Sequence, residues 1–316
     1  MSATAATTVG TWAGDRFAHE AFVYGTEAAV RDRVVPFVAE GLERGEATIV
    51  VASDGVRAVL DDALGAGRDD LAVFADSAGF WRGDGQQTLA AYHESMGPLL
   101  ETGRPWRLVG EPTWLAVPGG HVWSRFEAVA NDAFFDYPYY SLCLHDRRRL
   151  SPSLVDNARR THPLVWDHGE VVPSPHYQPT EEFLRSVEPP WTPAPEHRES
   201  VTVTTCGPAR RYVHANVVAA LTDRADDVTL AVHEIVANAL EAAGTAELSH
   251  WQVGGTQVWE VRDDGPGLHE AAAGYSPPSL DLAGGRGLWL ARSLADEAIV
   301  RQHGPGTAIR LIFSAA

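Results

Sequence analysis

The chain has 316 residues, and its 42 acidic side chains outnumber its 25 basic ones to give a formal net charge of −17 at pH 7. This length favours two domains over one, and the negative charge argues against nucleic acid or an anionic membrane as a partner. Two cysteines, Cys143 and Cys206, are too few for a disulfide framework or a cysteine-rich zinc site. Every basic residue is arginine, which excludes a Walker A loop, a protein-kinase lysine and a lysine Schiff base.

Residues 1–14 lack the basic and apolar regions of a signal peptide, and no apolar run is long enough to span a membrane. We therefore expect a flexible N-terminus, a cytoplasmic protein and no membrane partner.

Residues 15–185 alternate between helical and strand patterns. Apolar residues follow helical spacing from Glu27 and stop at Gly45, and a β-branched run follows at 47–53. A helix at 54–64 and a strand at 71–76 come next, and the alternation continues to about residue 146. This order predicts an α/β domain with a largely parallel sheet.

A Pro-rich stretch at 186–199 predicts a stiff, extended connector, with the domain boundary near residue 192. Residues 200–316 then predict an α+β domain, with helices against one face of a mixed sheet. Its expected strands are 200–206, 247–255, 256–265, 298–304 and 307–313, and its expected helices are 208–222, 226–243 and 287–297.

Glu234 and Asn238 are four residues apart in the helical pattern, which places them on one face roughly 40° from eclipsed. An amide oxygen is a hard ligand suited to Mg²⁺, and a carboxylate can hold water or accept a hydroxyl proton. By itself, the pair better fits the solvated edge of an amphipathic helix.

Asp263 ends a predicted strand and is followed by Gly265 and Gly267, where bare backbone can approach a flat ligand. A carboxylate in such a turn can accept a hydrogen bond from the exocyclic amine of adenine. Further on, glycines at 284, 285 and 287 precede a helix whose N-terminal amides, with Arg286, suit phosphates. Taken separately, each glycine pair is also ordinary turn chemistry.

In this order the motifs closely resemble the GHKL superfamily of Bergerat-fold ATPases. The N box corresponds to 234–238, the G1 box to 263–267 and the G2 box to 285–287, while Thr307 matches the family's threonine before the last strand. The resemblance implies ATP and Mg²⁺ as cofactors, with Mg²⁺ on Asn238. The implied nucleotide-binding residues are Asn238, Asp263, Gly265, Gly267, Gly285, Arg286, Gly287, Leu288 and Thr307.

Within that superfamily, the stretch 285–297 looks most like the anti-sigma-factor serine/threonine kinases. This resemblance implies a sigma factor and an antagonist protein as partners, a dimer, and Glu234 as the group that activates a protein hydroxyl. A histidine kinase fragment is the weaker alternative, because the connector stands where a phosphoacceptor helical hairpin would be. His233 lies inside the N-box helix and does not fit that acceptor role.

One residue departs from the family pattern: Glu241 stands three positions after Asn238, where a histidine or similar group is usual. Another carboxylate near the phosphates would be repulsive unless a base pairs with it. A module that binds ATP and sequesters a partner without phosphotransfer is therefore the main alternative function.

Residues 15–180 resemble the MEDS family of bacterial sensory domains, through the stretches 19–25, 37–46, 110–114, 141–146 and 158–163. The resemblance implies a RecA-like fold without a phosphate loop, and a pocket for a small-molecule or protein signal. The candidate pocket residues are His19, Tyr24, Cys143, His145 and His162. A metal or haem site and ordinary core polar residues are the alternatives, and only Cys143 and His145 have tight ligand spacing, on one face of a strand.

Overall fold

The computed structural model describes residues 12–65, 71–73, 85–117, 119–275 and 286–315. The chain forms two compact units, Met1–Phe183 and Leu184–Ala316. Most of the expected N-terminal segment 1–14, the end of the expected strand at 71–76, and Gly284 and Gly285 lie outside the described residues.

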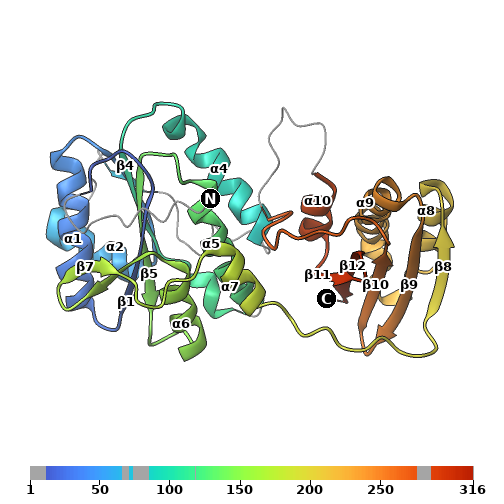
Figure 1. Cartoon of the computed structure of the whole chain (residues 1–316). Helices are drawn as coiled ribbons and strands as arrows, with labels where there is room; N and C mark the ends of the chain where they lie inside the picture. Colours follow the sequence, from blue (N-terminus) through green and yellow to red (C-terminus); the bar gives the residue numbers. More distant parts are fainter. Residues whose placement is uncertain (1–11, 66–70, 74–84, 118, 276–285, 316) are drawn as a thin grey trace. The chain divides into compact units, whose positions relative to one another are not determined.

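The first unit alternates strands and helices around a seven-stranded sheet (Figure 1). Its elements are β1 (Ala18–Tyr24), α1 (Glu27–Glu43), β2 (Ala47–Val51), α2 (Asp54–Leu64), β3 (Leu71–Val73), α4 (Gly85–Leu100), β4 (Trp106–Gly110), η1 (Thr113–Ala116), η2 (Gly120–Val122), α5 (Trp123–Ala133), β5 (Tyr139–Asp146), α6 (Pro152–Thr161), β6 (Leu164–Asp167), β7 (Glu170–Pro173) and α7 (Thr180–Ser186). Local chemistry sets several helix ends. The Thr26 side chain accepts from the Ala29 N–H at the start of α1, and Ser151 caps α6 with a proline directly after it.

The strand order of this sheet is β3-β2-β4-β5-β1-β6-β7, and every pairing is parallel except that of β6 with β7. The β6–β7 hairpin turns at His168 and Gly169, whose φ angles are +47° and +90°. Two positive φ angles in a two-residue loop match the twist of the flanking strands. The sequence pattern did not reveal this hairpin or helix α7.

The two faces of the sheet differ in chemistry because side chains alternate along each strand. Phe22, Leu142 and Leu144 point to the face covered by α1 and α2, where they join an apolar core. On β5 the alternate residues Ser141, Cys143 and His145 point to the other face, where His145 contacts Glu127 of α5 and Cys143 lies near His162, which follows α6. His19, Cys143 and His145 therefore lie on one side of the sheet, opposite its main apolar core, whereas Tyr24 shares the face of Phe22 and belongs to that core.

The second unit places its helices on one face of a five-stranded sheet of order β11-β12-β10-β9-β8. All of its pairings are antiparallel, so the expectation of a mixed sheet is wrong. The expected helix at 208–222 is confirmed in its first part only, because the helix ends at Ala215 and the chain resumes as a 3₁₀ turn at Ala219. The elements are β8 (Glu199–Val203), α8 (Cys206–Ala215), η3 (Ala219–Arg224), α9 (Ala225–Ala243), β9 (Ala246–Val253), β10 (Thr256–Arg262), α10 (Arg286–Leu294), β11 (Glu297–His303) and β12 (Gly306–Ser314).

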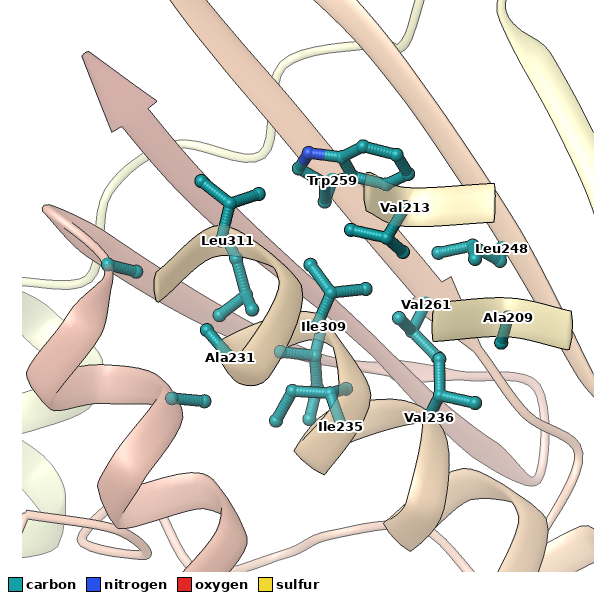
Figure 2. Close-up of a cluster of buried hydrophobic side chains, with 14 of the residues drawn as sticks. Ala209, Val213, Ala231, Ile235, Val236, Leu248, Trp259, Val261, Ile309 and Leu311 are labelled. Carbon is teal, nitrogen blue, oxygen red and sulfur yellow. The ribbon is translucent and has the colours of Figure 1, made fainter. Parts of the chain in front are cut away.

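Helix α9 is the centre of this unit, with α8 and α10 packed on either side of it. Its residues Ala231, Ile235 and Val236 face Trp259, Val261, Ile309 and Leu311 from the sheet (Figure 2). The apolar stripe of α9 is thus buried in the core, and the polar edge of the helix faces α10. Gly244, with φ +75°, ends the helix in the left-handed conformation that glycine adopts most readily.

The connector at 188–192 packs on the opposite face of the second sheet. The Arg310 guanidinium lies 3.7 Å above the Trp191 ring and 5.0 Å from the Trp251 ring. It also donates to the Thr192 carbonyl at 2.5 Å and to the buried Glu260 carboxylate at 2.6 Å. This part of the Pro-rich stretch is therefore held by the domain that follows it.

Among the described residues, no helix is both long enough and apolar enough to cross a membrane.

Candidate nucleotide site and buried histidine cluster

Glu234 and Asn238 project from α9 toward the start of α10. A Cβ atom on Gly287 would stand 3.0 Å from Glu234 Oε2 and 3.1 Å from Asn238 Nδ2. The predicted N box and the last residue of the predicted G2 box are therefore in direct contact. Because a side chain would fill the space between them, this contact depends on glycine at 287.

Asp263 follows β10 and is fixed by its own turn. Its Oδ1 accepts from the Gly265 N–H at 2.8 Å, and its backbone N–H donates to the Thr307 carbonyl at 2.9 Å. A Cβ on Gly306 would stand 2.0 Å from the Asp263 carbonyl oxygen, so backbone packs on backbone here. A carboxylate has several acceptor positions, so the Asp263 side chain can hold its turn and still accept from a ligand.

A cavity of about 310 Å³ brings these stretches together. This volume lies in the range of small-molecule sites. Asn238 and Asp263 supply polar groups, and apolar side chains from α9, α10, β10 and β12 supply the walls. The lining residues are Ile235, Asn238, Ala239, Ala242, Val261, Asp263, Pro266, Gly267, Leu268, Ala273, Gly274, Leu288, Thr307 and Ile309.

Glu234, Gly265 and Gly287 are not among the residues that line this cavity in the described part of the chain, although they lie next to Asn238 and Asp263, which are. Arg286 is the exposed first residue of α10, and Gly285 lies outside the described residues. Glu241 is exposed on α9 and is not among the residues that line the cavity in the described part of the chain, whereas its neighbour Ala242 is.

The donor set fits a magnesium nucleotide. Apolar walls suit a flat base, Asp263 can accept from an amine, and the N-terminus of α10 favours negative charge. The Asn238 amide oxygen and the Glu234 carboxylate are hard oxygen ligands of the kind that Mg²⁺ prefers.

Comparison with known families supports this assignment. Residues 18–163 match the family model described as MEDS, the MEthanogen/methylotroph, DcmR Sensory domain, and residues 200–313 match the histidine kinase-like ATPase domain. The two matches support a fusion of a MEDS domain, in the first unit, to a histidine kinase-like ATPase domain, in the second. No curated protein matches the chain. The second match supports ATP binding and a kinase-like activity, and the first supports a sensory role.

In the MEDS domain, four of the five predicted pocket residues lie together. His19, Cys143 and His162 offer ligand atoms that all lie within 4.8 Å of one another, and a second group of the same size joins Glu127, His145 and His162. The rings of His19 and His162 are 3.8 Å apart, and those of His145 and His162 are 5.4 Å apart.

Tyr24 does not belong to this cluster, so its inclusion in the predicted pocket is wrong. It lies at the other end of β1, about 16 Å along the strand from His19. Its hydroxyl donates to Glu111 Oε1 at 2.6 Å, beside a separate crevice that Ser53 and Arg148 also line.

The cluster is buried, and burial shifts the pKa values of its side chains toward their neutral forms. Burial lowers the pKa of His19 to about 3, and it lowers the pKa of His162 well below its usual range. Burial also raises the pKa of the Cys143 thiol far above its usual value. Without a further charge nearby, these three groups are neutral at pH 7.

Sequence reasoning missed Glu127 and Asn131, which hold this cluster from α5. Asn131 Oδ1 is 3.0 Å from His19 Nδ1, and Glu127 Oε1 is 3.2 Å from His145 Nε2. The signal was present, because the two residues are four apart and therefore share a face of α5. Both are buried in a helix whose other residues are largely apolar.

A second cavity of about 60 Å³ borders the cluster, with His19, Glu127, Ser141 and Cys143 in its wall. The remaining lining is mostly aromatic and aliphatic, and it includes Trp114, Trp123, Phe126 and Met96 from the surrounding elements.

Proposed function

We propose that this chain is a signal-responsive anti-sigma-factor regulator. Its ATPase domain binds Mg·ATP and phosphorylates a serine or threonine of an antagonist protein, and its MEDS domain biases that activity after sensing a signal. In this proposal the ATPase domain has the Bergerat fold, and the MEDS domain has a RecA-like fold without a phosphate loop. It also takes the protein as cytoplasmic and dimeric.

One observation carries the nucleotide part of the proposal: residues from α9, β10 and α10 meet around one cavity. In this arrangement Asp263 accepts from the adenine amine, and Gly265 and Gly267 allow close approach of the base. Asn238 holds Mg²⁺, the α10 amides with Arg286 face the phosphates, and Thr307 closes the wall beside Asp263.

The chemical step assigned to Glu234 is proton removal. Its carboxylate accepts the proton of the protein hydroxyl as that oxygen forms a bond to the γ-phosphorus. The bond to the bridging oxygen of the β-phosphate breaks, and ADP leaves. Phosphoryl transfer depends mainly on positioning and charge neutralisation, and the half-buried Glu234 lies beside Asn238, where the magnesium would sit.

The connector disfavours a histidine kinase fragment. Residues 187–198 contain no helix, and helix α7 before them has seven residues. No helical hairpin therefore lies directly before β8 in this fully described stretch, as a phosphoacceptor domain of that kind would require.

The test separates binding from transfer. Asn238→Ala should remove the magnesium-dependent part of ATP affinity, measured by titration calorimetry with and without Mg²⁺. Glu234→Ala should keep that affinity and lose transfer of labelled phosphate from ATP to a bacterial anti-sigma-factor antagonist protein.

The outcomes are distinct. Unchanged nucleotide binding in Asn238→Ala would reject the site. ATP binding without transfer in the wild-type chain would favour a sequestering module, and acid-labile self-phosphorylation would favour a histidine kinase.

A further inference from the structure

We propose that the MEDS domain binds one transition-metal ion of the zinc type through His19 Nε2, Cys143 Sγ and His162 Nε2. This inference concerns the first unit alone and does not depend on ATP binding by the second. Three elements supply the ligands: β1 carries His19, β5 carries Cys143, and the chain just after α6 carries His162.

The hydrogen bonds around His19 fix its tautomer in the form that a metal requires. The Asn131 amide nitrogen donates to the carbonyls of Ala128 and Thr161 at 3.0 and 2.8 Å, so its Oδ1 must be the atom that faces His19. That oxygen accepts from His19 Nδ1–H at 3.0 Å. The Nε2 lone pair of His19 is therefore left facing Cys143 Sγ at 3.4 Å.

His162 has the same tautomer for a different reason. Its Nδ1 lies 2.8 Å from the Ala158 carbonyl, which can only accept, so Nδ1 carries the proton. Metal-bound histidines usually donate their second N–H to a carbonyl or amide oxygen in this way. Both imidazoles are thus oriented as ligands by groups that lie outside the site.

One ring nitrogen of His162 is buried without a hydrogen-bond partner among the described residues. This atom is Nε2, and His162 as a whole is 0% exposed. A buried lone pair without a donor is unusual in a folded protein. A cation at this point would satisfy His162 Nε2, His19 Nε2 and Cys143 Sγ together.

The distances allow such an ion with little movement. Cys143 Sγ and one ring nitrogen each of His19 and His162 lie within 4.8 Å of one another, whereas the corners of a tetrahedral zinc site with sulfur and nitrogen ligands are about 3.5 Å apart. No two ligand atoms have to approach each other by more than about 1.3 Å, and the ligands are imidazoles and a thiol of the type that zinc binds.

Charge and burial support a divalent ion. Glu127 Oε2 is buried without a partner among the described residues, and the same cavity borders Glu127, His19 and Cys143. The Cys143 thiolate and the Glu127 carboxylate together would balance two positive charges. The two nitrogens of His145 face two acceptors, the Cys143 carbonyl at 3.2 Å and Glu127 Oε1 at 3.2 Å. A neutral ring donates to one of them, and we assign His145 the role of positioning Glu127 and not that of a ligand.

Three protein ligands leave a fourth position, as in zinc sites that accept an exogenous ligand. Because the apolar cavity borders two of the ligands, this position is suited to a small molecule with one donor atom and an apolar body. The site would therefore couple a metal to the sensory pocket.

The experiment titrates the full-length chain, first freed of metal, with Zn²⁺ and with Co²⁺. We expect one ion bound per chain, and thiolate-to-cobalt charge-transfer absorption with Co²⁺. Cys206→Ser is the matched background, because Cys143 is then the single thiol and any such absorption must come from it.

In that background, Cys143→Ser should abolish the charge-transfer absorption. Cys143→Ser and His162→Gln should each weaken Zn²⁺ binding by more than about 100-fold, which exceeds the effect of losing an outer-shell partner. Circular dichroism confirms that each variant is folded. Absence of the absorption in the Cys206→Ser chain, or unchanged Zn²⁺ affinity in a folded Cys143→Ser chain, would overturn the proposal, and the first of these readouts needs no ligand variant.

Discussion

Two glycines at the nucleotide site differ in what surrounds them. A Cβ on Gly306 would stand 2.0 Å from the Asp263 carbonyl oxygen, and the main chain there cannot move enough to relieve this clash. A Cβ on Gly287 would instead meet the ends of two side chains, Glu234 at 3.0 Å and Asn238 at 3.1 Å. Gly306 therefore holds the strand packing, whereas Gly287 leaves room for the polar groups of the site.

Gly287→Ala should consequently weaken Mg·ATP binding about tenfold, or about 1.4 kcal/mol, with little loss of stability. The new methyl group displaces Glu234 and Asn238 from their place in front of α10. Titration calorimetry with Mg·ATP and urea unfolding measure the two effects.

Gly255→Ala is the matched control, since a Cβ there meets nothing within 4 Å. It should leave nucleotide affinity unchanged. Equal affinity in Gly287→Ala and in the wild-type chain would mean that Glu234 and Asn238 do not act from this position.

At the scale of elements, α9 contributes both to the core and to the nucleotide site because its two faces differ. Its apolar stripe packs on the sheet (Figure 2), and its polar edge carries Glu234 and Asn238 to the site. On the other face of the same sheet, the connector is held through Trp191, Arg310 and the ion pair of Arg301 with Glu188.

Trp191→Ala should lower the stability of the ATPase domain by about 1–2 kcal/mol, because a cation–π contact of a largely desolvated arginine is worth about that much. Arg310 is 3% exposed, and loss of the ring leaves its guanidinium less well packed. Urea unfolding followed by circular dichroism measures the change. Trp191→Phe, which keeps an aromatic face, should recover most of it, and a Trp191→Ala chain as stable as wild type would show that the connector adds nothing.

At the scale of the whole molecule, each unit has its own hydrophobic core. Separate cores predict separate unfolding transitions. Mg·ATP should raise the free energy of unfolding of the ATPase domain alone, by about 2.7 kcal/mol at a ligand concentration of 100 Kd. Only the unfolding temperature of that domain should therefore rise. Differential scanning calorimetry of the full chain measures this.

In that measurement Asn238→Ala should remove the ATP-induced shift and leave the MEDS transition where it was. A single transition that moves as one with ATP would contradict this division of the chain into two cooperative units.

Much of the ATPase domain was predictable because its signals are local. The α9 pattern, the β9–β10 hairpin and the glycine turns follow from the spacing of neighbouring residues, and the structure forms α9 at Ala225–Ala243 against an expected 226–243. The roles of Glu234, Asn238 and Asp263 stay predictions. The break after α8 and the short α10 were not predictable, since tertiary packing decides where a marginal helix ends.

The sequence by itself determined which short-range chemistry was available: the helical edge with a carboxylate and an amide, the acidic glycine turn, and the absence of lysine. Only the tertiary structure decided which distant groups meet. His19, Cys143 and His162 come from elements more than 120 residues apart at the extremes, and the parallel pairing of β1 with both β5 and β6 brings them together. The same pairing sends Tyr24 to the opposite end of the sheet, because a strand separates its first and last residues by its full length. Spacing along a chain reports neighbours on one helix or strand, whereas long-range contacts depend on how sheets and helices pack.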